Sequence, residues 1–167
     1  MKISMYSMAV ETFVPTLTKL STLLDKGLEH ATQKGFAPEV LVNARLAPDM
    51  LPLSRQVQIA CDMAKNGSSR LAAQEPPRFE DNEATIEELR TRISRTIDYL
   101  KTIAPNTFDG SEDRDIKIPL RDRTLEMKGL PFLRTWALPN FYFHVVATYM
   151  ILRHNGVAIG KLDFLTM

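Results

Sequence analysis

The chain is poor in the side chains that most often bind metals or carry out nucleophilic catalysis. Among 167 residues there are three histidines and a single cysteine, Cys61. One cysteine excludes a disulfide within the chain and is typical of proteins from a reducing compartment. Two of the histidines, His30 and His154, lie near the expected C-terminal ends of helices, where a partial positive charge suits the helix dipole. Only His144 stands in the middle of a predicted helix.

An excess of charge and a long hydrophobic run are also absent. The formal net charge is +1, so no overall field would attract nucleic acid or an anionic membrane. No basic stripe with interleaved aromatic residues is present either. No apolar run approaches the ~20 residues of a membrane span, and serines and Glu11 interrupt the N-terminal segment too often for a secretory signal. We therefore expect a cytoplasmic protein with neither a nucleic-acid partner nor a membrane partner.

Helical periodicity dominates the first two thirds of the chain. Apolar residues recur at three- and four-residue steps over residues 4–33, where Pro15 predicts a kink or a fresh helix start and Gly35 a C-terminal stop. A second helix is expected over residues 53–72, after a proline-containing link with one short helical turn near residues 40–45. The third has the clearest start, because Thr85 and Glu88 have the spacing of a capping box. It should end near Pro105.

Residues 109–129 have a different pattern. Apolar and polar residues alternate there with a period of two, which predicts a small β-hairpin. The last helix should open near Pro139 and close at Gly156. Together these elements predict one domain over residues 1–167, an all-α four-helix bundle with a small β-hairpin insert before the last helix. The long link between the first two helices argues against a simple meander.

Two segments resemble a known bacterial family. They are NARLAPDMLPLSRQVQIACDMAK (residues 43–65) and LPNFYFHVVATYMILRHNGVAIGKLDFL (residues 138–165). The chain resembles, nearly end to end, the domain-of-unknown-function family nineteen-ninety-three, which is similar to the DinB/YfiT-like superfamily. The resemblance implies a DinB-like four-helix bundle, often dimeric. In many superfamily members three histidines bind a divalent metal, one from the second helix and two, four residues apart, from the last.

This chain departs from the three-histidine pattern. The second helix offers Gln58, Cys61 and Asp62 at the candidate positions, and no histidine. His144 can match the first ligand of the last helix, but Thr148 stands four residues later. His154 is ten residues from His144, which places it ~80° away around the helix and ~15 Å along it. One metal ion cannot be reached from both. We therefore expect neither a metal site nor another cofactor.

The residues that remain as candidates lie on the second and last helices. Asn140, His144 and Thr148 share one face of the last helix at four-residue spacing. Such a polar stripe can line a pocket, or it can be a hydrogen-bonded network between helices. If the second and last helices face each other, Cys61 or Asp62 could approach His144. The candidate ligand pocket therefore comprises His144, Asn140, Thr148, Cys61, Asp62 and Gln58.

Aromatic residues surround the last helix on several sides, more than one core needs. They are Phe141, Tyr142, Phe143 and Tyr149. We expect one side to pack in the core and the other against a second subunit, which predicts a homodimer.

Three functions follow from these patterns. The first is a dimeric small-ligand-binding or accessory protein without the metal site. The second is a divergent metal-dependent transferase or hydrolase that uses His144 with Asp62 or Cys61. The third is a structural partner whose exposed aromatic helix is the functional surface.

Overall fold

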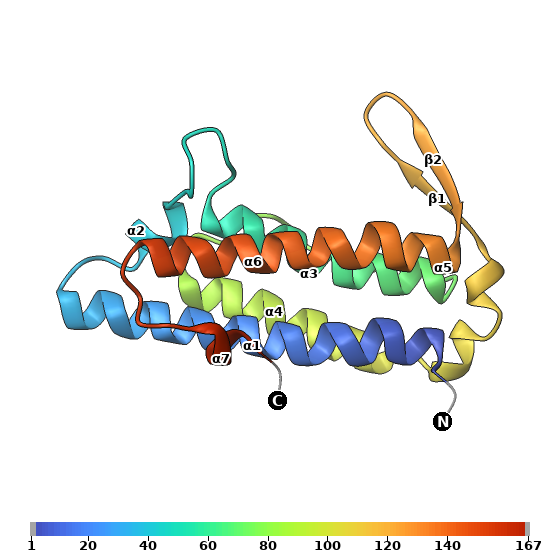
Figure 1. Ribbon diagram of the computed structural model, residues 1–167, viewed down its shortest axis with the longest axis horizontal. Helices are drawn as coiled ribbons and strands as arrows, with labels where there is room; N and C mark the ends of the chain where they lie inside the picture. The colour runs from blue at the N-terminus through green and yellow to red at the C-terminus, as the bar shows by residue number, and fades with distance from the viewer. Residues whose placement is uncertain (1–2, 166–167) are drawn as a thin grey trace.

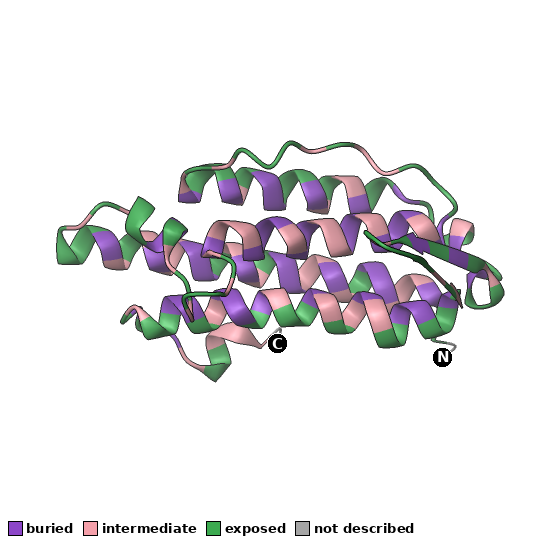
Figure 2. Cartoon of the chain, turned by 90° about the horizontal axis from the view of Figure 1, so that it is seen from above, coloured by how far each residue is buried: buried purple, intermediate pink, exposed green. Residues whose placement is uncertain are grey.

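Four long helices form the body of the protein. The structure is a computed structural model and describes residues 3–165. The helices are α1 (Met5–Lys34), α3 (Leu53–Leu71), α4 (Ile86–Thr102) and α6 (Leu138–His154). Figure 1 shows α1 and α6 running in one direction and α3 and α4 in the other. Because α3 and α4 are parallel, residues 72–85 cross the length of the bundle between them, as seen along the upper edge of Figure 2. The predicted four-helix bundle is thus confirmed, without a simple up-and-down order.

Helix α1 is a single helix through Pro15, so no fresh start occurs there. Phe13 and Leu17 on either side of Pro15 are fully buried, and core packing offsets the hydrogen bond that the proline removes. The Ser4 side chain accepts from the Ser7 amide at the N-terminus. At the other end, Gly35 adopts φ 72° and stops the helix as predicted, a left-handed conformation that glycine takes at little cost.

The remaining helical predictions agree closely with the structure. The short turn in the link is α2 (Glu39–Asn43), and the capping box at Thr85 and Glu88 opens α4. Apolar residues at helical spacing on α3 point into the core, all with no exposed surface: Leu53, Val57, Ala60, Ala64 and Leu71. In Figure 2 buried and exposed residues alternate along α1, α4 and α6, whereas the residues of α3 are buried or intermediate.

The predicted hairpin is present before the last helix. Two short 3₁₀ turns, η1 (Pro105–Phe108) and η2 (Ser111–Asp113), lead into β1 (Asp115–Pro119), which pairs antiparallel with β2 (Thr124–Lys128). Ile118 lies opposite Leu125 in this register. Both Ile116 and Ile118 are buried, because the inner face of β1 packs on the bundle. The hairpin tip projects away from it (Figure 1).

Helical backbone begins before the predicted start of the last helix. The segment α5 (Gly129–Pro131) leads into the π-helical stretch η3 (Phe132–Ala137), and α6 follows with Pro139 in its first turn. After Gly156 the chain folds back to α7 (Lys161–Phe164), which packs against α1. Among residues 3–165, no helix combines the length and apolar character needed to cross a bilayer.

Candidate functional site

The polar stripe of α6 meets α3 at one hydrogen bond. His144 Nδ1 lies 2.7 Å from Gln56 Oε1. Gln56 is almost fully buried, and its Nε2 donates to the Leu51 carbonyl at 3.1 Å. Because that donation leaves Oε1 to face the imidazole, Nδ1 of neutral His144 carries the proton. The α3 partner of His144 is therefore Gln56, and not Gln58, Cys61 or Asp62.

The second ring nitrogen of His144 faces outward. Nε2 makes no hydrogen bond to any residue in the described range, yet it is not among the fully buried polar atoms, so solvent reaches it. Burial of the ring lowers the pKa of His144, because desolvation disfavours the imidazolium. At neutral pH the side chain is thus a neutral imidazole held in one tautomer by Gln56.

Asn140 and Thr148 are satisfied within their own helix. Asn140 Nδ2 donates to the Trp136 carbonyl at 2.9 Å, and Thr148 Oγ1 donates to the His144 carbonyl at 3.0 Å. Thr148 is completely buried. The polar stripe was expected either to line a pocket or to form a hydrogen-bonded network between helices. Its hydrogen bonds, within α6 and to α3, match the network.

Cys61 faces a different neighbour. The thiol is fully buried and has a hydrogen-bonding partner in Thr96 on α4. Burial raises the pKa of Cys61 to about 12, against a smaller opposing effect from Thr96. A thiol with that pKa stays protonated at neutral pH, and the thiolate is the nucleophilic form. Cys61 therefore packs as a small core residue and lacks the environment of a reactive cysteine.

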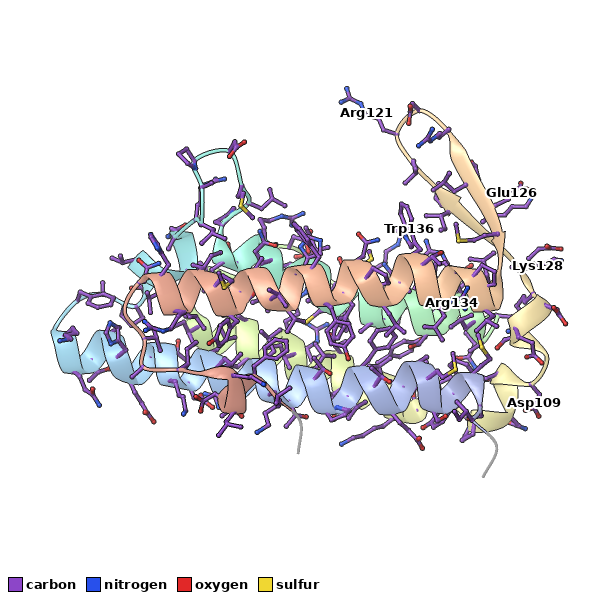
Figure 3. All side chains as sticks on the ribbon, in the orientation of Figure 1. Asp109, Arg121, Glu126, Lys128, Arg134 and Trp136 are labelled. Carbon is purple, nitrogen blue, oxygen red and sulfur yellow. The ribbon has the colours of Figure 1, made fainter. Side chains whose placement is uncertain are left out.

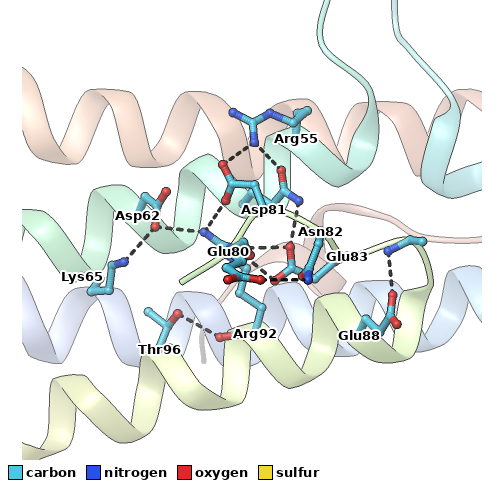
Figure 4. A network of polar contacts seen from close by, with 12 residues as sticks. Arg55, Asp62, Lys65, Glu80, Asp81, Asn82, Glu83, Glu88, Arg92 and Thr96 are labelled. Carbon is cyan, nitrogen blue, oxygen red and sulfur yellow. Dashed lines mark hydrogen bonds and ion pairs between the residues drawn. The ribbon is translucent and has the colours of Figure 1, made fainter. Parts of the chain in front are cut away.

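Asp62 and Gln58 belong to a charged network between α3, α4 and the crossover 72–85. Asp62 Oδ1 accepts from Arg92 Nη2 at 3.0 Å and lies 3.2 Å from Lys65 Nζ. Gln58 Nε2 donates to Glu83 Oε2 at 2.8 Å. Figure 4 shows Asp62 bonded to Arg92, with Lys65 beside Asp62. The side chains of Asp62 and Gln58 therefore lie on the α4 side of α3 and do not contact His144.

Arg92 is the centre of this network, and sequence reasoning did not identify it. Its side chain has no exposed surface and also pairs with Asp81 at 2.9 Å and Glu83 at 3.0 Å. Burial alone would lower its pKa, but the hydrogen bond to Glu83 and the charges of Asp62 and Glu83 raise it. The available signal was the acidic run 80–83 directly before the capping box. A charged residue on the buried side of α4 must be paired, and these are its partners.

The donor set does not fit the metal site that the superfamily resemblance implies. Across residues 3–165 no three His, Cys, Asp or Glu side chains form a group that could hold a metal ion. At the α3–α6 contact the groups are one imidazole and one amide, and the amide oxygen faces the protonated Nδ1. Neither amide nor hydroxyl can replace the two further imidazoles.

The opposite face of α6 is apolar and exposed. Phe143 keeps 59% of its surface exposed, and Tyr142, Val146 and Met150 are exposed beside it. With Leu46 and Met50 of the α2–α3 loop, these side chains line an open groove of about 420 Å³, and no residue of the described range that lines it is charged. Figure 1 shows this loop and the hairpin projecting from the same side of the bundle.

Comparisons with known proteins agree with this fold. The profile of the family described as "Domain of unknown function (DUF1993)" matches residues 5–165. A crystal structure of a DinB family member protein from Shewanella denitrificans has a TM-score of 0.92 and 40% sequence identity, over 97% of this chain and 92% of that one. No curated protein matches the chain. The match over residues 5–165 and this structural likeness show that the chain belongs to the DUF1993 family and has a DinB-like fold.

Proposed function

We propose that this protein is a metal-independent binding protein that acts as a homodimer through the outer face of α6. The observation that carries the proposal is the division of α6 into two faces. The inner polar face is occupied by hydrogen bonds to Gln56 and to the helix itself. The outer face exposes Tyr142, Phe143, Val146 and Met150 in one row. Such a row of exposed apolar side chains is typical of an interaction site.

A second copy of the chain is the occupant that suits this face. In a two-fold contact every residue meets the same surface of the other copy, so a charged patch would repel itself. The residues known to line the groove on α6, all from the part of the chain that the structure describes, are uncharged and mostly apolar. The overall formal charge of +1 adds little repulsion between two copies. Tyrosine, phenylalanine and methionine are also the residues enriched at the centre of interfaces.

Metal-dependent transfer or hydrolysis with His144, Asp62 or Cys61 finds no comparable support. Each of the three has a different partner, namely Gln56, Arg92 and Thr96. A reaction that uses them together would need α3 to rotate and Arg92 to lose its carboxylates.

Sedimentation velocity of the wild type and of Phe143→Asp tests the proposed dimer. We expect a dimeric wild type and a monomeric variant, because the new carboxylates would face each other across the two-fold contact. Leu162→Asp is the matched control, since Leu162 is exposed to 68% on α7, which packs against α1. A monomeric wild type, or equal effects of both substitutions, would contradict the proposal.

A further inference from the structure

A second, smaller cavity lies under the hairpin. It has a volume of about 190 Å³ and is enclosed by α3, β1 and η3. The roof is formed by Ile118, Pro119 and Leu120, and the walls include Phe132 and Met63. None of the pocket residues expected on α6 or α3 lines it. Pockets for drug-sized ligands measure roughly 300–1,000 Å³, so this smaller, mostly apolar cavity has room only for a smaller organic molecule.

Three polar side chains line this cavity without partners. They are Asn66 and Arg70 on α3 and Trp136 on η3, all half-buried. Within residues 3–165 none of their side chains makes a hydrogen bond or an ion pair, although each has donors to offer. None of their polar atoms is among the fully buried unpaired atoms, so solvent reaches them and a ligand could take the place of that water. All three line one cavity.

The charge in this cavity is of one sign. Among residues 3–165, Arg70 is the one charged residue in the lining of this cavity, and no carboxylate of that range lines it. Burial lowers the pKa of Arg70, and the negative charge of Glu75 only partly opposes that effect. An anion bound beside the guanidinium would offset the cost of this desolvation by direct attraction.

The segment that positions Trp136 is the π-helical stretch. Helices with this wide turn are rare and occur frequently at functional sites. Here the turn contributes Phe132, Trp136 and Ala137 to the cavity wall. Figure 3 shows Trp136 rising from the helix toward the hairpin.

We propose that this cavity binds a small organic carboxylate with an apolar body. The planar guanidinium of Arg70 matches a carboxylate in a two-pronged hydrogen bond. The Asn66 amide and the Trp136 indole N–H are further donors in the same lining, and the apolar body would lie under Ile118 and Leu120. One cationic residue balances one carboxylate, whereas a phosphate dianion would keep an uncompensated charge. A carboxylate would be the ligand of the proposed binding protein, and the assignment rests on the proposed function only in assuming that the protein binds a ligand.

Fluorescence of Trp136 gives a direct test, because it is the one tryptophan in the chain. Benzoate and butyrate are titrated at constant ionic strength, with benzamide and inorganic phosphate as neutral and dianionic probes. We expect a saturable change with both carboxylates and none with benzamide or phosphate. No saturable response to either carboxylate, or an equal response to benzamide or phosphate, would overturn the proposal.

Substitutions test whether the fluorescence change comes from binding in this cavity. Arg70→Met should weaken carboxylate binding about 10- to 100-fold, the value of one to two charge-assisted hydrogen bonds. Arg134→Met is the matched control, since Arg134 is an exposed residue of the same π-helical stretch, and should bind like the wild type. If Arg70→Met does not fold, Asn66→Ala should give a smaller loss. Unchanged affinity in the folded Arg70 variant, or in Asn66→Ala where Arg70→Met does not fold, would overturn the assignment.

The dimer and the carboxylate site can fail separately. A monomer that still binds benzoate would contradict the dimer and leave the cavity assignment intact. A dimer whose fluorescence does not change with carboxylates would contradict the cavity assignment and leave the dimer intact.

Discussion

Asp62 Oδ1 accepts a hydrogen bond from Arg92 Nη2 at 3.0 Å, across the contact between α3 and α4. The carboxylate that sequence reasoning placed near His144 therefore neutralises a fully buried guanidinium instead. Arg92 holds Asp62, Asp81 and Glu83 together, and so fixes the crossover 80–83 on the bundle.

Arg92→Met should lower the free energy of unfolding by about 3–5 kcal/mol, because Glu83 would lose its cation at a nearly buried site, and Asp62 and Asp81 would keep only Lys65 and Arg55. Arg95→Met is the matched control. Arg95 is exposed and lies 4.3 Å from the centre of the Phe79 ring, a contact worth about 1 kcal/mol or less. Urea denaturation at neutral pH measures both. Equal losses in the two variants would show that the buried network contributes nothing beyond an exposed arginine.

Cys61 should be unreactive in the folded protein. With a pKa of about 12, roughly one thiol in ten thousand is ionised at pH 8, and the side chain is also shielded from solvent. Labelling with Ellman's reagent should be slow in buffer and fast in urea, with a rate that follows unfolding. Rapid labelling of the folded protein would contradict the environment described for this thiol.

Because of His144, the free energy of unfolding should fall as the pH drops below the ordinary pKa of an imidazole. The unfolded chain has an imidazole pKa near 6.5 and the folded chain a lower one, so the unfolded state takes up the proton first as pH falls. The stability contributed by neutral His144 is complete above about pH 6.5 and is lost as the pH falls below it. In His144→Gln, the free energy of unfolding in urea should change less between about pH 7 and pH 5.5 than in the wild type. The same decline in both proteins would assign it to other groups.

Substitution by alanine should change stability in opposite directions at two glycines. A Cβ on Gly129 would lie 1.8 Å from the Ser111 carbonyl oxygen, which is backbone and cannot move aside. Gly129→Ala should therefore cost about 3 kcal/mol or more. A Cβ on Gly67, inside α3, would meet Ala137 Cβ at an ordinary 3.5 Å. Gly67→Ala should stabilise by roughly 0.5–1 kcal/mol through helix propensity, and thermal unfolding of both variants checks the contrast.

Much of the fold could be predicted from local signals. The capping box at Thr85 and Glu88 gave the start of α4, Gly35 gave the end of α1, and alternation gave the hairpin. These features are encoded by neighbouring residues. The π-helical stretch before α6 follows from no local sequence pattern.

The site was less predictable because it depends on how α3 is rotated. Apolar spacing marks one face of a helix, but α3 is buried on several sides, including Gln56, Gln58 and Lys65. Periodicity cannot show which buried glutamine faces α6 and which faces α4. The structure places Gln56 on His144 and Gln58 on Glu83. Arg92 was missed because its burial depends on pairing with Asp62 of α3 and with carboxylates of residues 80–83, and apolar spacing does not reveal such pairing.

Metal content is the most direct test of the central claim, that the polar face of α6 is a hydrogen-bonded contact and not a metal centre. The measurement is elemental analysis of untagged protein after incubation with zinc, nickel or manganese and removal of free metal, for the wild type and His144→Ala. We expect far less than one metal ion per chain in both proteins. One ion per chain in the wild type that is lost in His144→Ala would contradict the account and restore the metal-dependent alternative.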